Sequence, residues 1–135
     1  MIEGLSHITF MVRDLKRMSH FLKTIFDAQE VYSSADKTFS ISREKFFLIN
    51  DIWLAIMEGE PLSAKTYNHV AFKIPQEEFD KYIERERTLG IEIHKGRSRV
   101  PGEGNALYFY DYDNHLFEFT TGTLQQRLEQ YDRYS

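Results

Sequence analysis

The feature that most constrains the fold is an internal repeat: the segment YNHVAFKI at residues 67–74 resembles LSHITFMV at residues 5–12. In both segments apolar residues alternate with other residues, which is typical of a strand with one buried face. A helical pattern follows each segment, and aromatic-rich strand patterns follow each helix. A displacement of 62 residues places His7 on His69 and superimposes the order of elements. The sequence therefore predicts an α+β fold of two tandem βαβββ modules.

Local signals mark where the individual elements begin and end. Asp14 is a predicted N-cap of the first helix, Gly90 a predicted stop for the second, and Asn50-Asp51 a predicted turn. We expect strands at 4–12, 29–32, 39–41, 45–49, 53–57 and 67–74, helices at 15–27 and 76–89, a hairpin at 108–119 and a loop at 95–105.

Length and composition fit one domain. The chain has 135 residues, of which 41% are hydrophobic. We expect a single domain over 1–135, with repeats at about 4–60 and 66–122 and a C-terminal helix at about 123–133. The net charge of −4 gives no electrostatic reason to expect nucleic acid or an anionic membrane as a partner.

The sequence also limits the compartment and the chemistry. No apolar run reaches the length of a membrane span, and the N-terminus lacks the pattern of a signal peptide. The chain has no Cys, which excludes disulfides, thiolate metal sites and Cys nucleophiles. We therefore expect a cytoplasmic protein.

The second hairpin, YFYDYDNHLFEF, carries a carboxylate among apolar side chains. Asp and Asn residues at 111–114 predict its turn, because their side chains hydrogen-bond nearby backbone groups. In the strand after the turn, Glu118 shares a face with Leu116 and Thr120. A carboxylate buried alone is costly, so Glu118 must be paired, protonated, bound to a metal or open to solvent. The 62-residue displacement places Ile56 on Glu118, so the carboxylate is not duplicated.

Each opening strand also carries a histidine on the side opposite its apolar residues. His7 shares its face with Thr9, and His69 shares its face with Ala71. If the two sheets curl toward each other, both histidines and Glu118 point into one cup. Two imidazoles and one carboxylate suit Mn²⁺, Fe²⁺ or Zn²⁺, and three protein ligands leave positions for water or substrate. The alternative is that both are ordinary surface or hydrogen-bonded histidines.

Motifs along nearly the whole chain resemble one family. GLSHITF, REKFFL, WLAIMEGE, YNHVAFKI, PGEG, YFYDYDNHLFEF and GTLQQRL together resemble the fosfomycin-resistance proteins of the vicinal oxygen chelate superfamily, and most closely their FosX-type epoxide hydrolases. The resemblance implies a cup-shaped sheet around one divalent metal, with Mn²⁺ as the ion and His7, His69 and Glu118 as its ligands. It also implies a homodimer with paired modules, in which each site draws on both chains.

The resemblance also assigns the reaction. Fosfomycin is a small epoxide that bears a phosphonate, so opening its ring needs a Lewis acid at the epoxide oxygen and a nucleophile at carbon. The metal would act as the Lewis acid, while Glu44, in the motif SREKFFL, would be the general base that activates water. Without the resemblance, Glu44 is a solvated residue between Arg43 and Lys45.

The phosphonate requires cationic and hydroxyl donors. Arg97 and Arg99 lie in a loop rich in cations and glycine that we expect to close over the anion. Ordinary readings remain for each candidate, as strand aromatics in the core, an exposed helix residue or a solvated loop. The further positions that match substrate-contacting positions of the family are Thr9, Trp53, Tyr67, Tyr108 and Arg127.

One departure from the FosX-type pattern follows the motif PGEG, where Asn105 and Ala106 stand in place of an expected Arg and a small hydroxyl residue. The loss of a cation and a hydroxyl donor predicts weaker or reoriented phosphonate binding rather than a different reaction. Two other functions stay open. One is a thiol transferase of the same family, against which Glu44 argues, and the other is a non-catalytic module that binds a phosphonate and releases it unchanged.

Overall fold

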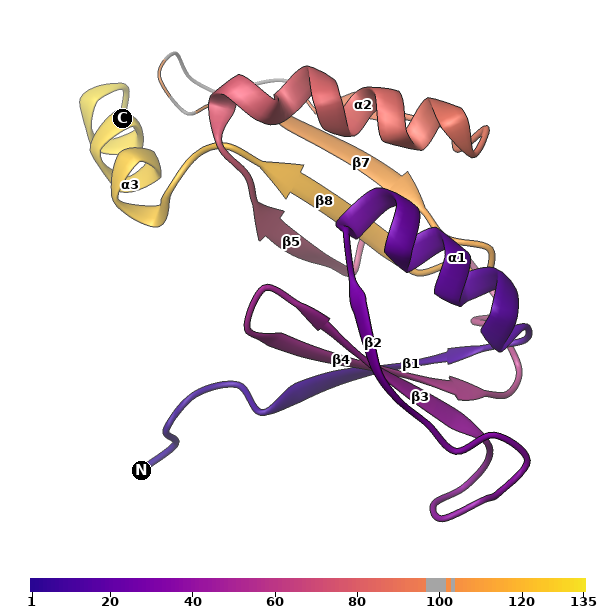
Figure 1. Cartoon of the computed structure of the whole chain (residues 1–135). Helices are drawn as coiled ribbons and strands as arrows, with labels where there is room; N and C mark the ends of the chain where they lie inside the picture. Colours follow the sequence, from indigo (N-terminus) through magenta and orange to yellow (C-terminus); the bar gives the residue numbers. More distant parts are fainter. Residues whose placement is uncertain (97–101, 103) are drawn as a thin grey trace. The chain divides into compact units, whose positions relative to one another are not determined.

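The protein folds as two compact units, each built on a four-stranded sheet (Figure 1). The computed structural model describes residues 1–96, 102 and 104–135. The first unit comprises Met1–Lys65 with Asp111–His115, and the second comprises Thr66–Tyr110 with Leu116–Ser135. Among the described residues, no helix combines the length and the apolar character that crossing a membrane requires.

The first unit begins with one βαβββ module. Its first and last strands pair in parallel, and the remaining pairs are antiparallel, which gives the strand order first, fourth, third, second. Asp14 caps the helix as predicted, because its side chain accepts a hydrogen bond from the Arg17 N–H at 3.0 Å. The elements are β1 (His7–Val12), α1 (Leu15–Phe26), β2 (Gln29–Ser33), β3 (Glu44–Ile49) and β4 (Ile52–Glu58).

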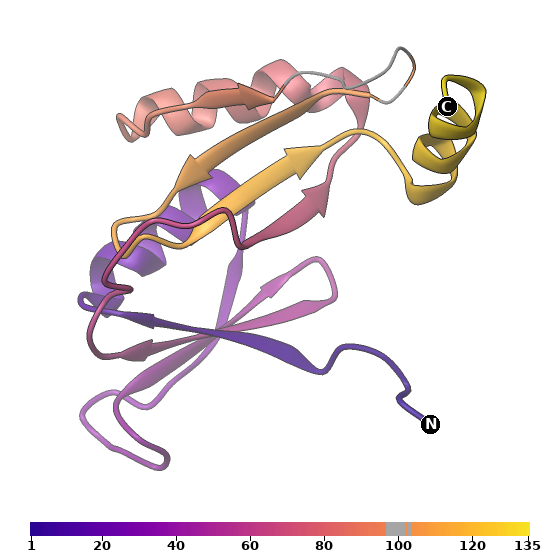
Figure 2. The ribbon, with the colours of Figure 1, turned by 180° about the vertical axis from the view of Figure 1, so that it is seen from behind.

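The second unit repeats the same strand order, with β5 parallel to β8, which confirms the two predicted tandem modules. One helix covers a face of the sheet, and the last helix lies beyond the end of the final strand (Figures 1 and 2). The elements are β5 (His69–Lys73), the short 3₁₀ helix η1 (Gln76–Glu78), α2 (Phe79–Thr88), β6 (His94–Gly96), β7 (Ala106–Tyr110), β8 (Leu116–Thr120) and α3 (Leu124–Arg133).

Two predicted segments differ from the structure. The strand predicted at 39–41 is wrong, since these residues lie in the loop between β2 and β3, where Phe39 is 73% exposed and Ile41 is 80% exposed. Two apolar residues separated by one polar residue are too short a pattern to define a strand. Conversely, Lys95 was predicted to begin a loop but belongs to strand β6, which pairs with β7 over three residues. Such a short edge strand leaves little signal in the sequence.

Helix and sheet bury their apolar faces against each other in each unit. The inner face of α1 includes Phe21, Leu22 and Ile25, all fully buried. In the second unit, Tyr82 of α2 contacts Phe119 of β8, with ring centroids 4.7 Å apart. A fully buried large side chain such as Phe21 or Phe119 contributes about 1.5–3 kcal/mol of transfer free energy. The opposite face of each sheet is free to carry polar groups.

The hairpin β3–β4 corresponds to the hairpin β7–β8, but the correspondence shifts by one residue between the first strand and the second. In the first sheet Phe46 lies opposite Ala55, and in the second Tyr108 lies opposite Glu118. Glu118 is therefore equivalent to Ala55 and not to Ile56, as a constant displacement predicted. The second hairpin has one more residue in its turn, and a slip of one residue moves every side chain to the other face of a strand.

The turn of the second hairpin has the predicted chemistry. Asp111 Oδ1 accepts hydrogen bonds from the backbone N–H groups of Asp113 and His115, both at 2.8 Å. Asp113 in turn accepts a hydrogen bond from the Arg13 backbone N–H at 3.1 Å. These contacts fasten the turn within the first unit at the end of β1.

Candidate functional site

His69 and Glu118 form the centre of the candidate site in the second unit. His69 Nε2 lies 3.0 Å from Glu118 Oε1, and the Glu118 side chain is only 6% exposed. His69 Nδ1 lies 2.6 Å from the Tyr67 carbonyl oxygen. A carbonyl oxygen can only accept, so Nδ1 carries a proton, and in the neutral imidazole the lone pair is on Nε2, toward Glu118.

This pair fits two neighbouring ligands of a divalent ion. Metal bonds of about 2.1 Å that meet at a right angle place their nitrogen and oxygen atoms roughly 3.0 Å apart, the separation of His69 Nε2 and Glu118 Oε1. The hydrogen bond from His69 to the Tyr67 carbonyl is the orienting contact that metal-binding histidines usually make. Two of the three predicted ligands are therefore brought together.

The third predicted ligand, His7, is held in the first unit. Its Nδ1 lies 2.9 Å from Ser6 Oγ, and its ring centroid lies 4.2 Å from that of Trp53. No three His, Cys, Asp or Glu side chains in the described part of the chain gather as a set that could hold a metal ion. The participation of His7 in a metal site thus stays a prediction.

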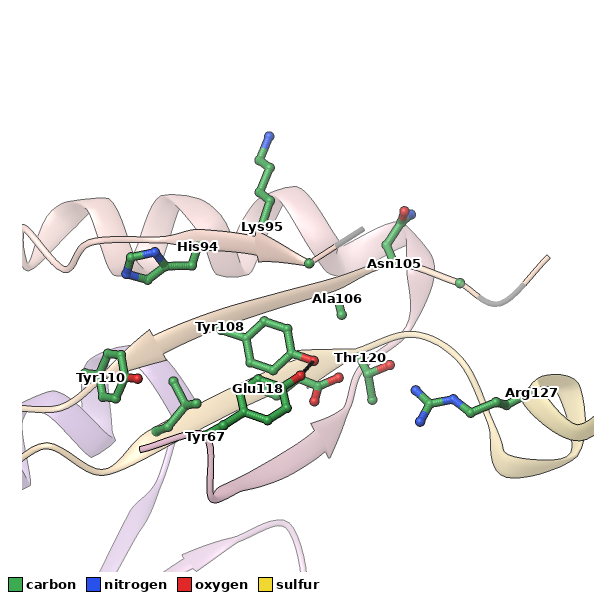
Figure 3. Close-up of a pocket in the computed structure, with 13 residues that line it drawn as sticks. Tyr67, His94, Lys95, Asn105, Ala106, Tyr108, Tyr110, Glu118, Thr120 and Arg127 are labelled. Atoms are coloured by element: carbon green, nitrogen blue, oxygen red, sulfur yellow. Dashed lines mark hydrogen bonds between the residues drawn. The ribbon is translucent and has the colours of Figure 1, made fainter. Parts of the chain in front are cut away.

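Tyr108 connects Glu118 to Tyr67. The Tyr67 hydroxyl donates to the Tyr108 hydroxyl at 3.0 Å, as the dashed line in Figure 3 shows. Burial, the bond from Tyr67 and the nearby charge of Glu118 together raise the pKa of Tyr108 well above its ordinary range. Tyr108 is therefore a neutral phenol at physiological pH and can donate a hydrogen bond.

An open pocket of about 820 Å³ lies on this face of the second sheet. Glu118, Tyr108 and Tyr67 line it, and Arg127 extends toward it from α3 beside Thr120 (Figure 3). The sequence reasoning missed several lining residues. Tyr110 could have been found, because residues two positions apart on a strand share a face and Tyr108 was already a candidate. His94 gave no signal, because its strand was not predicted. The missed residues include His94, Tyr110 and Thr120.

Glu44 lies on the same face of the first sheet as His7 and Thr9. Residues in register on neighbouring strands share a face, and every second residue along a strand returns to it. Glu44 is the first residue of β3 and is half-buried. The three registered rows are His7–Trp53–Leu48, Thr9–Ala55–Phe46 and Met11–Met57–Glu44.

Trp53 presents an unusual donor beside His7. Its Nε1 is buried and has no hydrogen-bond partner among the described residues. The indole ring also contacts Phe46 edge-on, with centroids 5.1 Å apart. The packing role that the sequence left open for Trp53 is therefore present, next to the predicted ligand His7.

Two predicted contacts, Arg97 and Arg99, lie outside the described residues. Asn105 and Ala106, which depart from the family pattern, are described where β7 begins. The Asn105 side chain donates to Gln76 Oε1 at 3.0 Å, and its backbone N–H donates to Thr121 Oγ1 at 2.9 Å. Asn105 thus has structural partners of its own, although both it and Ala106 line the pocket.

Comparison with known proteins defines the family. The model of the Glyoxalase/Bleomycin resistance protein/Dioxygenase superfamily matches residues 4–119. The fosfomycin resistance protein FosX of Listeria innocua serovar 6a is 61% identical over 133 residues, which cover 98% of this chain and 100% of that protein. The chain belongs to the FosX group of this superfamily.

Solved FosX structures share the fold. A crystal structure of a FosX variant from Listeria monocytogenes, complexed with Mn(II) and 1S,2S-dihydroxypropylphosphonic acid, has a TM-score of 0.88 and 54% identity, covering 97% of this chain and 99% of that one. FosX from Listeria monocytogenes complexed with Mn(II) and a sulfate ion has a TM-score of 0.87 and 53% identity, with the same coverage. Both FosX structures therefore contain Mn(II).

Proposed function

We propose that this protein is a Mn(II)-dependent epoxide hydrolase that inactivates fosfomycin by adding water to its oxirane ring. The observation that carries the proposal is the convergence of His69 Nε2 and Glu118 Oε1 at 3.0 Å, beside tyrosine hydroxyls in an open pocket. The FosX relative with Mn(II) also holds a dihydroxypropylphosphonic acid. That compound has the vicinal diol that results when water adds across an epoxide.

His69 and Glu118 would hold the divalent ion, with His7 as the third ligand. Such an ion supplies Lewis acidity that polarises the epoxide carbon–oxygen bond. The Tyr67 carbonyl keeps His69 in the tautomer that leaves Nε2 available. The Tyr108 hydroxyl lies beside Glu118 and would limit how that carboxylate rotates.

Glu44 would be the general base. Its carboxylate takes a proton from water while the water oxygen forms a bond to a ring carbon and the ring carbon–oxygen bond breaks. The proton then passes to the oxygen that has left the carbon, which completes the diol. Support for this role is the shared sheet face of Glu44, Thr9 and His7.

The phosphonate would be bound by donors from several elements. Arg127 offers a guanidinium from α3, and Tyr108 offers a neutral hydroxyl from β7. Thr9 and the buried Trp53 Nε1–H are further donors on the face of His7. We extend the proposal to the remaining predicted contacts, which are Tyr67, Arg97 and Arg99.

The active species is proposed to be a homodimer in which each metal site draws on both chains. This proposal is supported by the division of the ligands between the two compact units: His7 belongs to one unit, and His69 and Glu118 belong to the other. A ligand set divided in this way can be completed by a second copy of the chain.

Phosphorus NMR of fosfomycin incubated with Mn(II)-loaded protein and no thiol tests the proposal. We expect the diol signal with the wild type and its loss, by at least about a hundredfold in rate, in Glu44→Gln, because general base catalysis contributes roughly 10²–10⁴-fold. Glu60→Gln, an exposed carboxylate in the same half, is the matched control and should keep the wild-type rate. Persistence of fosfomycin in all samples, or turnover only after a thiol is added, would overturn the hydrolase assignment.

A further inference from the structure

Ser34 is a buried serine at the start of the loop between β2 and β3, and two hydrogen bonds join it to Glu44. Its exposed fraction is 4%. The Ser34 N–H donates to the Glu44 carbonyl at 3.0 Å, and the Ser34 Oγ accepts from the Glu44 N–H at 3.0 Å. The pair extends the β2–β3 ladder by one position beyond Ser33 and Lys45. The backbone of Glu44 is therefore held by Ser34 through both of its polar groups.

The hydroxyl takes the place of a backbone acceptor. In a regular antiparallel ladder, every second pair of opposite residues exchanges both N–H···O=C bonds, and Ser34 and Glu44 occupy such a position. Here the Ser34 carbonyl instead accepts from the Lys37 N–H at 2.9 Å, as part of a turn in which Ala35 has a φ of +54°. The Glu44 N–H would thus lack its ladder acceptor, and the Ser34 hydroxyl supplies one.

The other side of β3 cannot replace this contact. The Arg43 carbonyl accepts from the Glu58 N–H at 2.9 Å, so the bonds of β3 to β4 fall at Arg43 and Lys45. Glu44 and Met57 then form a pair that exchanges no bonds. The N–H and carbonyl of Glu44 point toward β2, where Ser34 lies. Without the hydroxyl, the Glu44 N–H loses its acceptor, and only the bond from the Ser34 N–H to the Glu44 carbonyl holds this residue to β2.

We propose that Ser34 is a positioning residue that fixes the direction of the Glu44 carboxylate, a role that rests on Glu44 being the base of the proposed hydrolase. The carboxylate leaves the backbone at the residue that Ser34 holds, so fraying there displaces the base relative to its water. A displacement of about 1 Å in a catalytic group can cost roughly a hundredfold in rate. A partial loosening at a strand end is expected to cost about tenfold.

The test compares Ser34→Ala with Ser33→Ala. Ser33 is the matched control, because its Oγ also accepts a backbone hydrogen bond in this turn, from the Ala35 N–H at 3.1 Å, whereas its ladder partner is Lys45 and not Glu44. We expect Ser34→Ala to lower kcat for fosfomycin hydrolysis about tenfold, with KM and the Kd of the diol product within twofold of wild type. Ser33→Ala should match the wild type, and Ser34→Thr, which keeps the hydroxyl, should recover at least half of kcat.

The proposal would be overturned if kcat of Ser34→Ala stayed within twofold of wild type. It would also be overturned if Ser34→Ala lost as much affinity for the diol product as it lost in kcat, which indicates general damage. A kcat of Ser34→Thr no higher than that of Ser34→Ala would contradict it as well. If Ser34→Ala does not fold by circular dichroism, Ser34→Cys replaces it, since sulfur is a weaker acceptor. Failure of the hydrolase assignment looks different, because the wild type then yields no diol at all.

Discussion

Glu86 on α2 is a buried carboxyl group that should make the protein less stable as the pH rises. Its side chain is fully buried, and neither carboxyl oxygen has a hydrogen-bond partner among the described residues. Burial disfavours the charged form and raises the pKa of Glu86 from 4.5 to about 8. Glu86→Gln keeps the shape of the side chain and removes its ionisation, so the variant isolates this effect.

The magnitude follows from the two pKa values. Between pH 4.5 and 8 the unfolded chain releases the Glu86 proton and the folded chain keeps it, so stability falls by about 1.4 kcal/mol per pH unit. At pH 7 the loss of stability amounts to about 3 kcal/mol relative to Glu86→Gln, and above pH 8 it levels off at about 5 kcal/mol. Below pH 4.5 the carboxyl group is neutral in both states and the difference disappears.

Urea unfolding of the wild type and Glu86→Gln at several pH values between 4 and 9 measures this difference. Glu84→Gln is the control, because Glu84 is an exposed residue of the same helix, 69% exposed and paired with Arg87. We expect Glu86→Gln to become progressively more stable than wild type as the pH rises, while the Glu84→Gln difference stays flat and small. A difference in stability between Glu86→Gln and wild type that does not change with pH would show that Glu86 does not bind a proton more tightly in the folded chain.

Two further predictions concern the site. If each site draws on both chains, mixing His7→Ala chains with Glu118→Ala chains, each inactive alone, should restore fosfomycin hydrolysis. One of the two sites in the mixed dimer then keeps all its ligands. Complete inactivity after verified subunit exchange would contradict the shared site. Tyr108→Phe removes the hydroxyl that accepts from Tyr67 and contacts Glu118, so kcat/KM should fall about tenfold, as measured by steady-state kinetics, while Tyr110→Phe, on the same strand face, should fall less. Equal losses in both variants would contradict the specific role of Tyr108.

The architecture could be predicted from the sequence because its signals are periodic and repeated. Alternation identified β1 and β5, helical spacing and caps identified α1 and α2, and the recurrence of this order implied two similar sheets. These patterns report which face of each element is apolar, and burial of that face drives the fold. The segment at 39–41 misled for the same reason, because its apolar residues are exposed.

The site could be predicted only in its residue types. The sequence placed His69 and Glu118 on strands and left several states open for the carboxylate, whereas the structure brings Nε2 and Oε1 to 3.0 Å and uses the Tyr67 carbonyl to choose the tautomer of His69. The contact between His69 and Glu118 joins residues far apart in the chain, and no local pattern encodes their distance.

The two βαβββ modules, the apolar faces and the candidate ligands His7, His69 and Glu118 could be read from the sequence alone, because they follow from residue identity and short-range periodicity. The candidate base Glu44 came only from the resemblance to the FosX-type family. The residue of β4 that corresponds to Glu118 is known only from the strand pairing of the folded protein, because one extra residue in a turn reverses the face of every residue in the strand that follows. The tertiary structure also decided the contact of Ser34 with Glu44, because that bond exists only where a turn diverts the Ser34 carbonyl from the ladder.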